Sequence, residues 1–364
     1  MRKLATIRTI TDIRPIPGAD RIEVAQVDGW ECVVKKGEFH VGQEIVYVEV
    51  DSIMPERPEF EFLRDRKFRV RTIKLRKQVS QGLVLPLSIL PDGTGCDIGD
   101  DVTEALGVKK YDPQAEQERM LLSCADDDRV KDHGKIFQFM MRFHWFRKAF
   151  GPRPRKKGFP AWIVKTDEER IQNKTAMFER EKENGTTFMV TEKIDGQSAT
   201  YFLQKIGRKK YEFGVCSRNI RLGKPDNSSY WTIAAKYEIK KVLEGLIGDY
   251  DRIVLQGEII GTGIQKNKYR VNGYDFYAFN LIFPDHKCDT KEIARLLYPY
   301  SIKTVPILED SKVLPETIAD LVEYAKGTST LLDGQKREGV VMRSYDPDIS
   351  FKVINPDFLL ANDE

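Results

Sequence analysis

The hydrophobic residues in the first hundred positions fall at alternate places in short runs, and turn residues separate the runs. Alternation with a period of two is typical of strands that bury one face. Asp28 and Gly29 stand between two of these runs and form a two-residue hairpin signal. The four clearest runs are residues 22–27, 30–34, 44–50 and 82–86.

A fifth run, residues 67–77, alternates apolar with basic side chains. Its apolar positions change face half-way along, so we expect one strand with a β-bulge near Thr72. Basic residues along a barrel strand can contact phosphates, and charge on an edge strand also prevents aggregation; both interpretations stay open. Short antiparallel strands in this number predict a small β-barrel over residues 1–105, most economically an oligonucleotide/oligosaccharide-binding (OB) barrel.

Residues 159–364 show longer apolar runs that alternate with helical patterns. Thr166 or Asp167 is a candidate N-cap, because acidic residues follow in what would be the first helical turn. Together the elements predict an α+β domain of antiparallel sheets with flanking helices. We expect strands at 188–193, 200–203, 211–216, 253–261, 274–283, 337–343 and 349–354, and helices at 230–246 and 315–324.

The stretch between these regions, residues 106–158, is expected to be a connector. Residues 134–150 are rich in Phe, Met and Trp and predict a helix that packs on a neighbouring domain. Residues 151–158 combine glycine, proline and basic residues, which predicts a linker that either contacts phosphates or serves as a solvated hinge. The acidic run 126–128 is interpreted as solvated surface.

Composition narrows the class of protein. The chain has 364 residues, 32% of them charged and 41% hydrophobic, which is typical of a globular protein. Its formal net charge is only +3, so any polyanion site must come from local basic patches. The five cysteines are scattered, and neither they nor the four histidines show ligand spacing. We therefore expect a reducing compartment (cytoplasmic, nucleoid or nuclear), no secretion, no membrane span and a monomer.

Lys193 is the candidate nucleophile. An apolar run, residues 188–190, leads into it, Asp195 follows two positions later, and Gly196 permits a sharp turn. If the strand continued through Asp195, the two side chains would share a face roughly 7 Å apart. By itself the pattern Lys-x-Asp-Gly is equally typical of a strand end with a solvated lysine.

Five further elements follow Lys193 in a fixed order: Arg218 after a strand, Glu258 in an apolar strand, Phe279 in an aromatic strand, Glu338 before Gly-Val-Val, and Lys352. This order resembles the covalent nucleotidyltransferases, the polynucleotide ligases and mRNA-capping enzymes, which have an ATP-grasp-like ligase core. An OB-like segment that precedes the core is similar to the fifth family of RNA ligases, the Naegleria and Deinococcus type. Residues 160–173 also resemble the segment before the lysine motif in that family.

The resemblance implies an ATP-dependent RNA ligase, active in RNA repair or nick sealing. A lysine attacks the α-phosphorus of ATP to give lysyl-AMP, AMP passes to a 5′-phosphate end, and a 3′-hydroxyl displaces it. The attacking amine must be uncharged, although a free lysine is protonated at neutral pH. The catalytic residues implied are Lys193, Asp195, Glu258, Glu338 and Lys352.

The same resemblance implies the ligands of the nucleotide and of a metal ion. Glu258 and Glu338 would hold Mg²⁺ or Mn²⁺, Glu258 would also help to bind the ribose, and Phe279 would stack on adenine. Phe276 and Phe279 lie on opposite faces of one strand, so only one can line the pocket. The further nucleotide contacts implied are Glu192, Arg218, Arg170, Gln172 and Lys352.

The sequence departs from the family pattern at two places. The glutamate usual two residues before the nucleophile is replaced by Thr191, and Glu192 adjoins Lys193 instead. The last motif usually has two lysines, whereas here Ser350 and Ile354 flank Lys352. A capping-type guanylyltransferase, a DNA ligase and an RNA-binding protein that keeps the fold are the alternatives. Nicked duplex, broken tRNA and single-strand ends are all candidate substrates.

Overall fold

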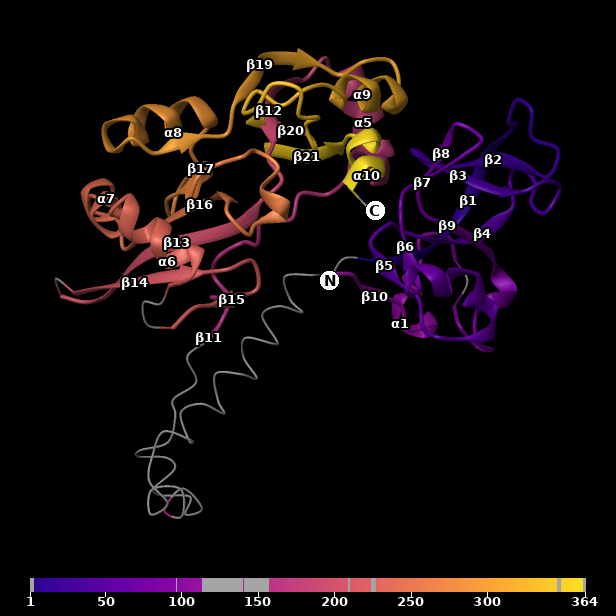
Figure 1. Ribbon diagram of the computed structural model, residues 1–364, viewed down its shortest axis with the longest axis horizontal. Helices are drawn as coiled ribbons and strands as arrows, with labels where there is room; N and C mark the ends of the chain where they lie inside the picture. The colour runs from indigo at the N-terminus through magenta and orange to yellow at the C-terminus, as the bar shows by residue number, and fades with distance from the viewer. Residues whose placement is uncertain are drawn as a thin grey trace. The chain divides into compact units, whose positions relative to one another are not determined.

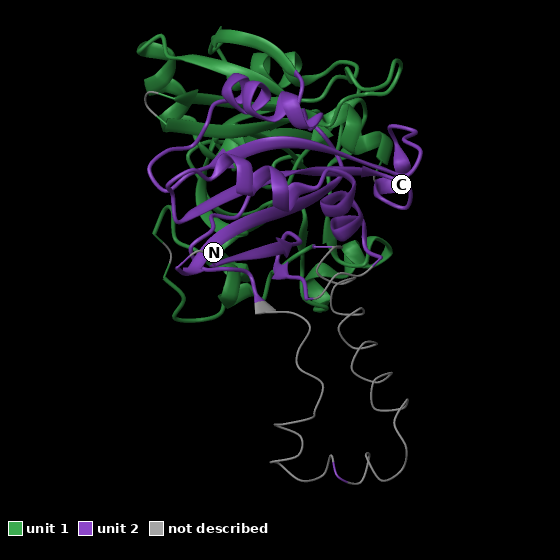
Figure 2. Cartoon of the chain, turned by 90° about the vertical axis from the view of Figure 1, so that its left-hand side faces the viewer, with its two compact units in different colours: residues 1–111, 168–193, 307–364 green, residues 112–167, 194–306 purple. Residues whose placement is uncertain are grey.

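The structure is a computed structural model that describes residues 3–95, 97–112, 140, 157–208, 210–223, 227–345 and 348–362. The expected helix at 134–150, the acidic run and the basic linker lie outside these residues, apart from Met140, Lys157 and Gly158. The chain divides into two compact units, shown in Figure 2. Unit 1 holds residues 1–111, 168–193 and 307–364, and unit 2 holds residues 112–167 and 194–306. The domain boundaries expected at residues 105 and 158 stay predictions.

The N-terminal part of unit 1 is a curved five-stranded sheet in the order β3-β2-β1-β4-β9 (Figure 1). Its long central strand, β1, pairs with β4 through its first half and with β2 through its second half. β1 therefore joins the β2–β3 hairpin to the β4–β9 pair. Trp30 and Tyr47 stack at 5.8 Å in one of its two apolar clusters. The strands are β1 (Ala5–Pro15), β2 (Ile22–Val27), β3 (Trp30–Lys35), β4 (Glu44–Val48) and β9 (Leu83–Pro86).

Shorter elements complete this region. A three-stranded sheet has the order β10-β5-β6, and β7 pairs with β8 in a separate hairpin. The bounds are β5 (Ser52–Ile53), β6 (Arg69–Val70), β7 (Ile73–Leu75), β8 (Gln78–Ser80), β10 (Lys109–Lys110), η1 (Pro58–Arg66), η2 (Leu87–Ile89) and α1 (Thr103–Leu106).

The expectation of one strand over residues 67–77 is wrong. Lys67 and Phe68 have positive φ angles of 52° and 59°, and they end η1 instead of starting a strand. The extended segment then breaks between β6 and β7, which belong to different sheets. The change of face in the apolar pattern was a sign of this break and not of a β-bulge. The hairpin at Asp28 and Gly29 is confirmed, because Val27 pairs with Trp30 across a two-residue turn.

The other part of unit 1 is a four-stranded sheet in the order β19-β12-β20-β21. Its apolar cluster includes Phe188, Val190 and Phe351, and helices α5 and α9 contribute Phe178 and Leu321. The elements are η3 (Ile171–Asn173), α5 (Thr175–Glu183), β12 (Thr187–Lys193), β19 (Ile307–Val313), α9 (Ile318–Ala325), β20 (Gly339–Tyr345), β21 (Asp348–Ile354) and α10 (Pro356–Asn362).

Unit 2 is built on a seven-stranded sheet in the order β11-β15-β14-β13-β16-β17-β18. Helices α6, α7 and α8 pack on it and enclose one large apolar cluster. The strands are β11 (Lys157–Gly158), β13 (Gln197–Gly207), β14 (Lys210–Cys216), β15 (Ile220–Arg221), β16 (Arg252–Gly261), β17 (Tyr274–Ile282) and β18 (Lys303–Thr304). The helices are α6 (Ser229–Lys236), α7 (Ile239–Leu246), η4 (Gln265–Asn267), α8 (Thr290–Leu297) and η5 (Tyr298–Tyr300).

Two helix predictions are corrected. The helix expected at 230–246 is two helices, and Glu238 between them has a positive φ of 47°. Ile233 and Ile239 are both fully buried, and six residues apart in a straight helix their side chains would point about 120° away from each other. The break therefore lets both side chains enter the core.

The second correction concerns the residues after Thr166 and Asp167. They do not begin a helix, since α5 starts only at Thr175. The backbone of residues 168–170 runs alongside β21 instead, where Lys352 N donates to Glu169 O at 2.8 Å. Pairing with a distant strand overrides the local capping pattern.

Candidate active site

Lys193 is the last residue of β12, and Glu338 immediately precedes the neighbouring strand β20. The final pair of this ladder joins Lys193 to Gly339. Gly339 has a φ of 155°, and a Cβ there would lie 2.2 Å from Val353 O, so only glycine allows β20 to begin this close to β21. The resulting geometry brings Lys193 Nζ to 2.6 Å from Glu338 Oε2. The two side chains are 24% and 14% exposed, so the pair is partly shielded from water.

Glu192, next to the lysine, points to the other face of β12 and is buried, with 1% exposure. Its carboxylate accepts hydrogen bonds from Ser329 Oγ, from Thr330 N at 2.8 Å and from Thr330 Oγ1 at 2.7 Å. The structure therefore gives Glu192 a role in holding the 329–330 loop beside β12. Its predicted contact with the nucleotide is untested.

Lys352 stands in the middle of β21 and pairs with Val341. Its neighbours explain the missing second lysine of the motif. Ser350 Oγ donates to Glu168 Oε2 at 2.6 Å, and Ile354 is 3% exposed in the core. Both flanking positions are thus occupied by structural contacts, and Lys352 is the cation that this strand offers.

Arg170 and Gln172 lie on the segment that runs beside β21, and both are buried. Arg170 forms a parallel β-bridge with Lys352. Its Nη2 lies 3.5 Å from Asp51 Oδ2, and its guanidinium lies over the Trp30 ring, 5.6 Å from the centroid. Arg170 therefore connects β21, the strand of Lys352, to the N-terminal barrel within unit 1.

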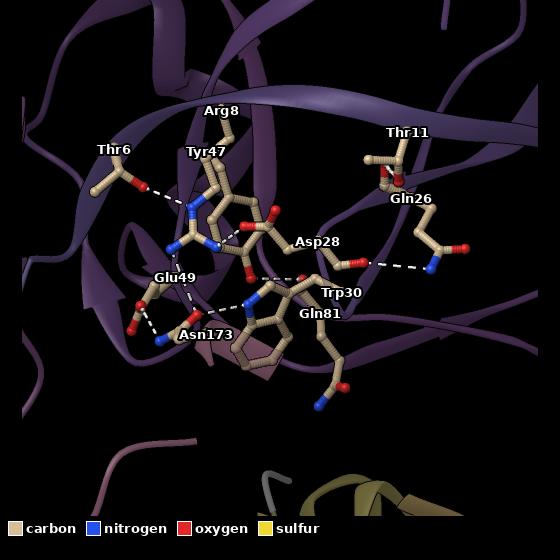
Figure 3. A network of polar contacts seen from close by, with 10 residues as sticks. All are labelled: Thr6, Arg8, Thr11, Gln26, Asp28, Trp30, Tyr47, Glu49, Gln81 and Asn173. Carbon is tan, nitrogen blue, oxygen red and sulfur yellow. Dashed lines mark hydrogen bonds and ion pairs between the residues drawn. The ribbon is translucent and has the colours of Figure 1, made fainter. Parts of the chain in front are cut away.

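Asn173 makes the same connection through polar bonds, as Figure 3 shows. Its Oδ1 accepts from Trp30 Nε1 at 2.8 Å, and its Nδ2 donates to Glu49 Oε1 at 2.6 Å. The β2–β3 turn also contacts this segment, because a Cβ on Gly29 would lie 2.8 Å from Gln172 Cα. The barrel thus fixes the backbone that carries Arg170 and Gln172.

In unit 2, Asp195 lies in the turn before β13 and not on a strand. Its side chain forms an ion pair with Lys268, and its backbone N–H donates to Tyr269 Oη at 2.9 Å. The expectation that Asp195 shares a strand face with Lys193 is wrong, because β12 ends at Lys193. Gly196 is required for close approach, since a Cβ there would lie 2.4 Å from Ile259 O.

Glu258 lies on β16, paired with Ser198 on one side and Tyr277 on the other, and is half-buried. Phe279 falls at a register shift in β17, where Gln256 pairs with Asn280 and Gly257 with Ala278. Phe279 is half-buried, whereas Phe276 is fully buried and packs edge-on against Tyr201. Phe279 is therefore the more exposed of the two aromatics, and its predicted stacking on adenine is untested.

Arg218 follows β14, as the sequence predicts. Its Nη2 lies 3.0 Å from Asp167 Oδ2, with both side chains about one-third exposed. The ion pair holds the guanidinium beside the segment that leads to residues 168–170. Its predicted contact with phosphate or sugar is untested.

Comparisons with known proteins identify the family of the chain. A family model described as RNA ligase matches residues 186–354, and one described as an OB-fold domain matches residues 4–87. A mutant Naegleria gruberi RNA ligase with AMP and Mn is 34% identical, with a TM-score of 0.79, 100% of this chain covered and 99% of that chain. The Naegleria gruberi RNA ligase with PPi has the same identity, coverage and TM-score. Another mutant of that enzyme, with ATP and Mn, is 34% identical with 99% of each chain covered and a TM-score of 0.79. Among curated proteins no match is found.

The chain belongs to the RNA ligase family. The predictions of a polynucleotide ligase and of an N-terminal OB barrel with a C-terminal ligase domain are confirmed. None of the helices in the described ranges has the length and hydrophobicity that a membrane-spanning helix needs.

Sequence reasoning missed several residues of the ligase that hold the candidate site in place. Lys268, the partner of Asp195, follows three residues with positive φ angles (Gln265, Lys266 and Asn267), and no local pattern marks it. Asn173 and Glu168 are ordinary polar residues in the sequence, and only their distant partners give them a role.

The sequence also suggested no grouping of histidine and cysteine ligands. In the structure, His286, Cys288 and Glu292 each place a potential ligand atom within 4.8 Å of the others. Burial is the main cause that raises the pKa of the Cys288 thiol, to about 12. The thiol is thus neutral at pH 7 in the absence of a metal ion.

Proposed function

We propose that this protein is an ATP-dependent RNA ligase that joins a 3′-hydroxyl RNA end to a 5′-phosphate end in nick sealing or RNA repair. The observation that carries the proposal is the Lys193–Glu338 pair at the adjoining ends of β12 and β20. It combines a partly accessible amine with a carboxylate, and both residues belong to the series of motifs whose order along the chain resembles that of the polynucleotide ligases.

Lys193 is the proposed nucleophile. An ammonium cannot attack, so the ion pair with Glu338 must open and the proton must leave Nζ before the reaction. Nζ then forms a bond to the α-phosphorus of ATP, the bond from that phosphorus to the β-phosphate oxygen breaks, and pyrophosphate leaves. Lys352 is the single lysine of the last motif, and we propose it as the cation that contacts the α-phosphate.

Two further transfers complete the reaction. The 5′-phosphate oxygen attacks the AMP phosphorus, and the bond from that phosphorus to Lys193 Nζ breaks. The product is an adenylylated RNA end and a free Lys193. A 3′-hydroxyl then attacks the 5′-phosphorus, forms the phosphodiester and releases AMP. Arg170 and Gln172 are proposed to contact the nucleotide or the 5′-phosphate, and Arg218 to contact phosphate or sugar.

Glu258 and Glu338 suit a divalent metal, because carboxylate oxygens are the donors that Mg²⁺ and Mn²⁺ prefer. A bound metal ion would supply positive charge that offsets the charge developing on the phosphates. The side chain of Glu258 is only half-buried, and so it remains able to accept such a ligand or the ribose hydroxyls. Asp195 is proposed as a catalytic residue, Phe279 as the stacking partner of adenine, and Glu192 as a nucleotide contact that acts beside its role in the 329–330 loop.

Incubation with α-labelled ATP and Mg²⁺ or Mn²⁺ tests the covalent step. Acid-stable label on the wild-type protein that disappears in Lys193→Ala, and persists in Lys205→Ala on the exposed end of β13, supports the proposal. Preferential labelling by GTP would select a capping-type activity instead. Sealing of nicked duplexes with RNA or DNA independently on the 3′ and 5′ sides would separate an RNA ligase from a DNA ligase, and absence of any label would leave only RNA binding.

A further inference from the structure

The β7–β8 hairpin of unit 1 has an unusual turn. Leu75 pairs with Gln78, so Arg76 and Lys77 form a two-residue loop. Both have positive φ angles, 49° and 69°. Positive φ at both loop positions is the backbone of a type I′ turn, for which Asn-Gly is the preferred sequence. Two long basic side chains thus occupy a backbone that strains them, and such strain is often retained where side chains have a function.

The tip of this hairpin is basic and exposed. Lys74, Leu75, Arg76 and Lys77 are four consecutive exposed residues, and Leu75 is 37% exposed. In the part of the chain that the structure describes, no carboxylate pairs with the three cations. Other arginines of the barrel differ, because Arg69 pairs with Asp51 and Arg14 pairs with Glu31. The tip therefore carries positive charge that the barrel does not neutralise.

The base of the hairpin, in contrast, is fixed to β3. Ser80 Oγ accepts from Val33 N at 2.8 Å, and Gln81 N donates to Glu31 O at 2.8 Å. Gln78 Nε2 also donates to Glu31 Oε2 at 2.8 Å. A strained turn on an anchored base presents its charges in a defined place, which lowers the entropy cost of binding a partner.

We propose that the β7–β8 hairpin binds the phosphate backbone of the RNA substrate through Lys74, Arg76 and Lys77, with Leu75 against the sugar edge. The inference rests on the proposed function, because it specifies how the ligase holds its polynucleotide. A nucleic-acid backbone matches three adjacent unpaired cations, since each neutralised phosphate releases a counterion and strengthens binding. The competing explanation is that these charges only protect an exposed strand edge from aggregation.

The double substitution Arg76→Asn with Lys77→Gly separates the two explanations. It installs the preferred type I′ sequence, so the midpoint of thermal unfolding is expected to stay the same or rise while two cations are lost. Binding to a nicked RNA duplex is measured between roughly 50 and 200 mM salt. At roughly 0.7–0.9 counterions per contact, the wild type should lose about sevenfold to twelvefold more affinity over this range than the variant.

Two matched variants control the experiment. Arg76→Lys with Lys77→Arg keeps the charges and should keep the salt dependence. Lys240→Gln with Lys241→Gln removes two exposed cations of α7 that are paired with Glu244 and Glu238, and it should leave RNA binding unchanged. A third variant, Arg76→Gln with Lys77→Gln, removes the same two charges without introducing a glycine. If the Asn-Gly variant fails to fold, this variant must show the weaker RNA binding and the smaller salt dependence.

Equal affinity and equal salt dependence in the wild type and in a folded charge-removed variant would overturn the hairpin proposal alone. If the wild type became labelled on Lys193 but bound no RNA at low salt, both the hairpin proposal and the RNA substrate would be wrong. If the Arg76→Asn, Lys77→Gly variant unfolds at a higher temperature than the wild type but binds RNA more weakly, the proposal is supported. The wild-type turn sequence would then strengthen RNA binding at the expense of stability.

Discussion

Lys193 Nζ and Glu338 Oε2 lie 2.6 Å apart although 145 residues separate them in the sequence. The pairing of β12 with β20 fixes this approach, because Lys193 and Gly339 are the last partners of the ladder. The carboxylate therefore arrives beside the amine as a consequence of strand register. A slip of one residue would turn one of the two side chains to the opposite face of the sheet.

Replacing Glu192 should destabilise the fold even though the residue adjoins the nucleophile. Glu192→Ala leaves the buried hydroxyl of Ser329 without its acceptor, and it also removes the acceptor of the N–H and hydroxyl of Thr330, which is an exposed residue. We expect a loss of about 2–4 kcal/mol in the free energy of unfolding, measured by urea denaturation. Glu323→Ala, at an exposed position of α9, is the control and should change stability by less than about 0.5 kcal/mol. Equal stability of Glu192→Ala and wild type would contradict the role assigned to this carboxylate.

Asn173 should prove essential for the connection between the barrel and the segment that carries Arg170. Asn173→Ala removes the acceptor of Trp30 Nε1 and one donor to Glu49 Oε1, and Glu49 is only 3% exposed. A cost of about 2–3 kcal/mol in unfolding free energy is expected. Asn173→Asp should cost more, because it places a second negative charge beside Glu49. Urea unfolding of both variants checks this order, and the opposite order would refute it.

The decrease in the free energy of unfolding at acid pH should depend on Asp275. Burial by itself raises the pKa of this carboxyl, but hydrogen bonds from Lys303, Tyr237 and Phe276 N outweigh it and hold the pKa below its usual value of 3.8. A carboxyl with a lowered folded pKa contributes stability that is present above its unfolded pKa and lost as the pH falls through the folded pKa. Asp275→Asn should therefore be less stable than wild type at pH 7, and the difference should shrink below about pH 4. Unfolding free energies measured from neutral to acid pH test this, and a constant difference would disprove it.

Gly196 should tolerate no side chain. A Cβ would lie 2.4 Å from Ile259 O and 2.8 Å from Glu258 Cγ, so Gly196→Ala must displace β16 or the Glu258 side chain. We expect a loss of about 1–3 kcal/mol in unfolding free energy together with weaker lysine labelling by α-labelled ATP. Gly158→Ala is the control, because its Cβ would meet nothing within 4 Å. Normal labelling and stability in Gly196→Ala would mean that β16 adjusts freely.

The sequence predicted the elements that local patterns specify. Asp28 and Gly29 mark their hairpin because turn chemistry is local. The prediction that only one of Phe276 and Phe279 is available to a ligand is consistent with their burial, because Phe276 is fully buried and Phe279 is half-buried. The sequence predicted wrongly where distant pairing overrides local preference. Glu168 to Arg170 resembles a helix start, yet β21 holds this segment extended.

The partners of the candidate residues were the least predictable part. Lys268 binds Asp195, and Ser329 with Thr330 bind Glu192, but these partners lie 73 to 138 residues away along the chain. Hydrophobic periodicity carries no information on such contacts, since it specifies only which face is buried. The family resemblance supplied the order of the motifs, and the structure supplied the side chains that hold them.

The most direct test of the account is peptide mapping of the protein after incubation with ATP and Mn²⁺, without RNA. The account predicts one AMP per chain on the peptide that contains Lys193, and loss of that adduct in Lys193→Arg and, by about 10²-fold or more in rate, in Glu338→Gln. An AMP adduct on a different lysine, or undiminished labelling of the Lys193→Arg protein, would contradict it.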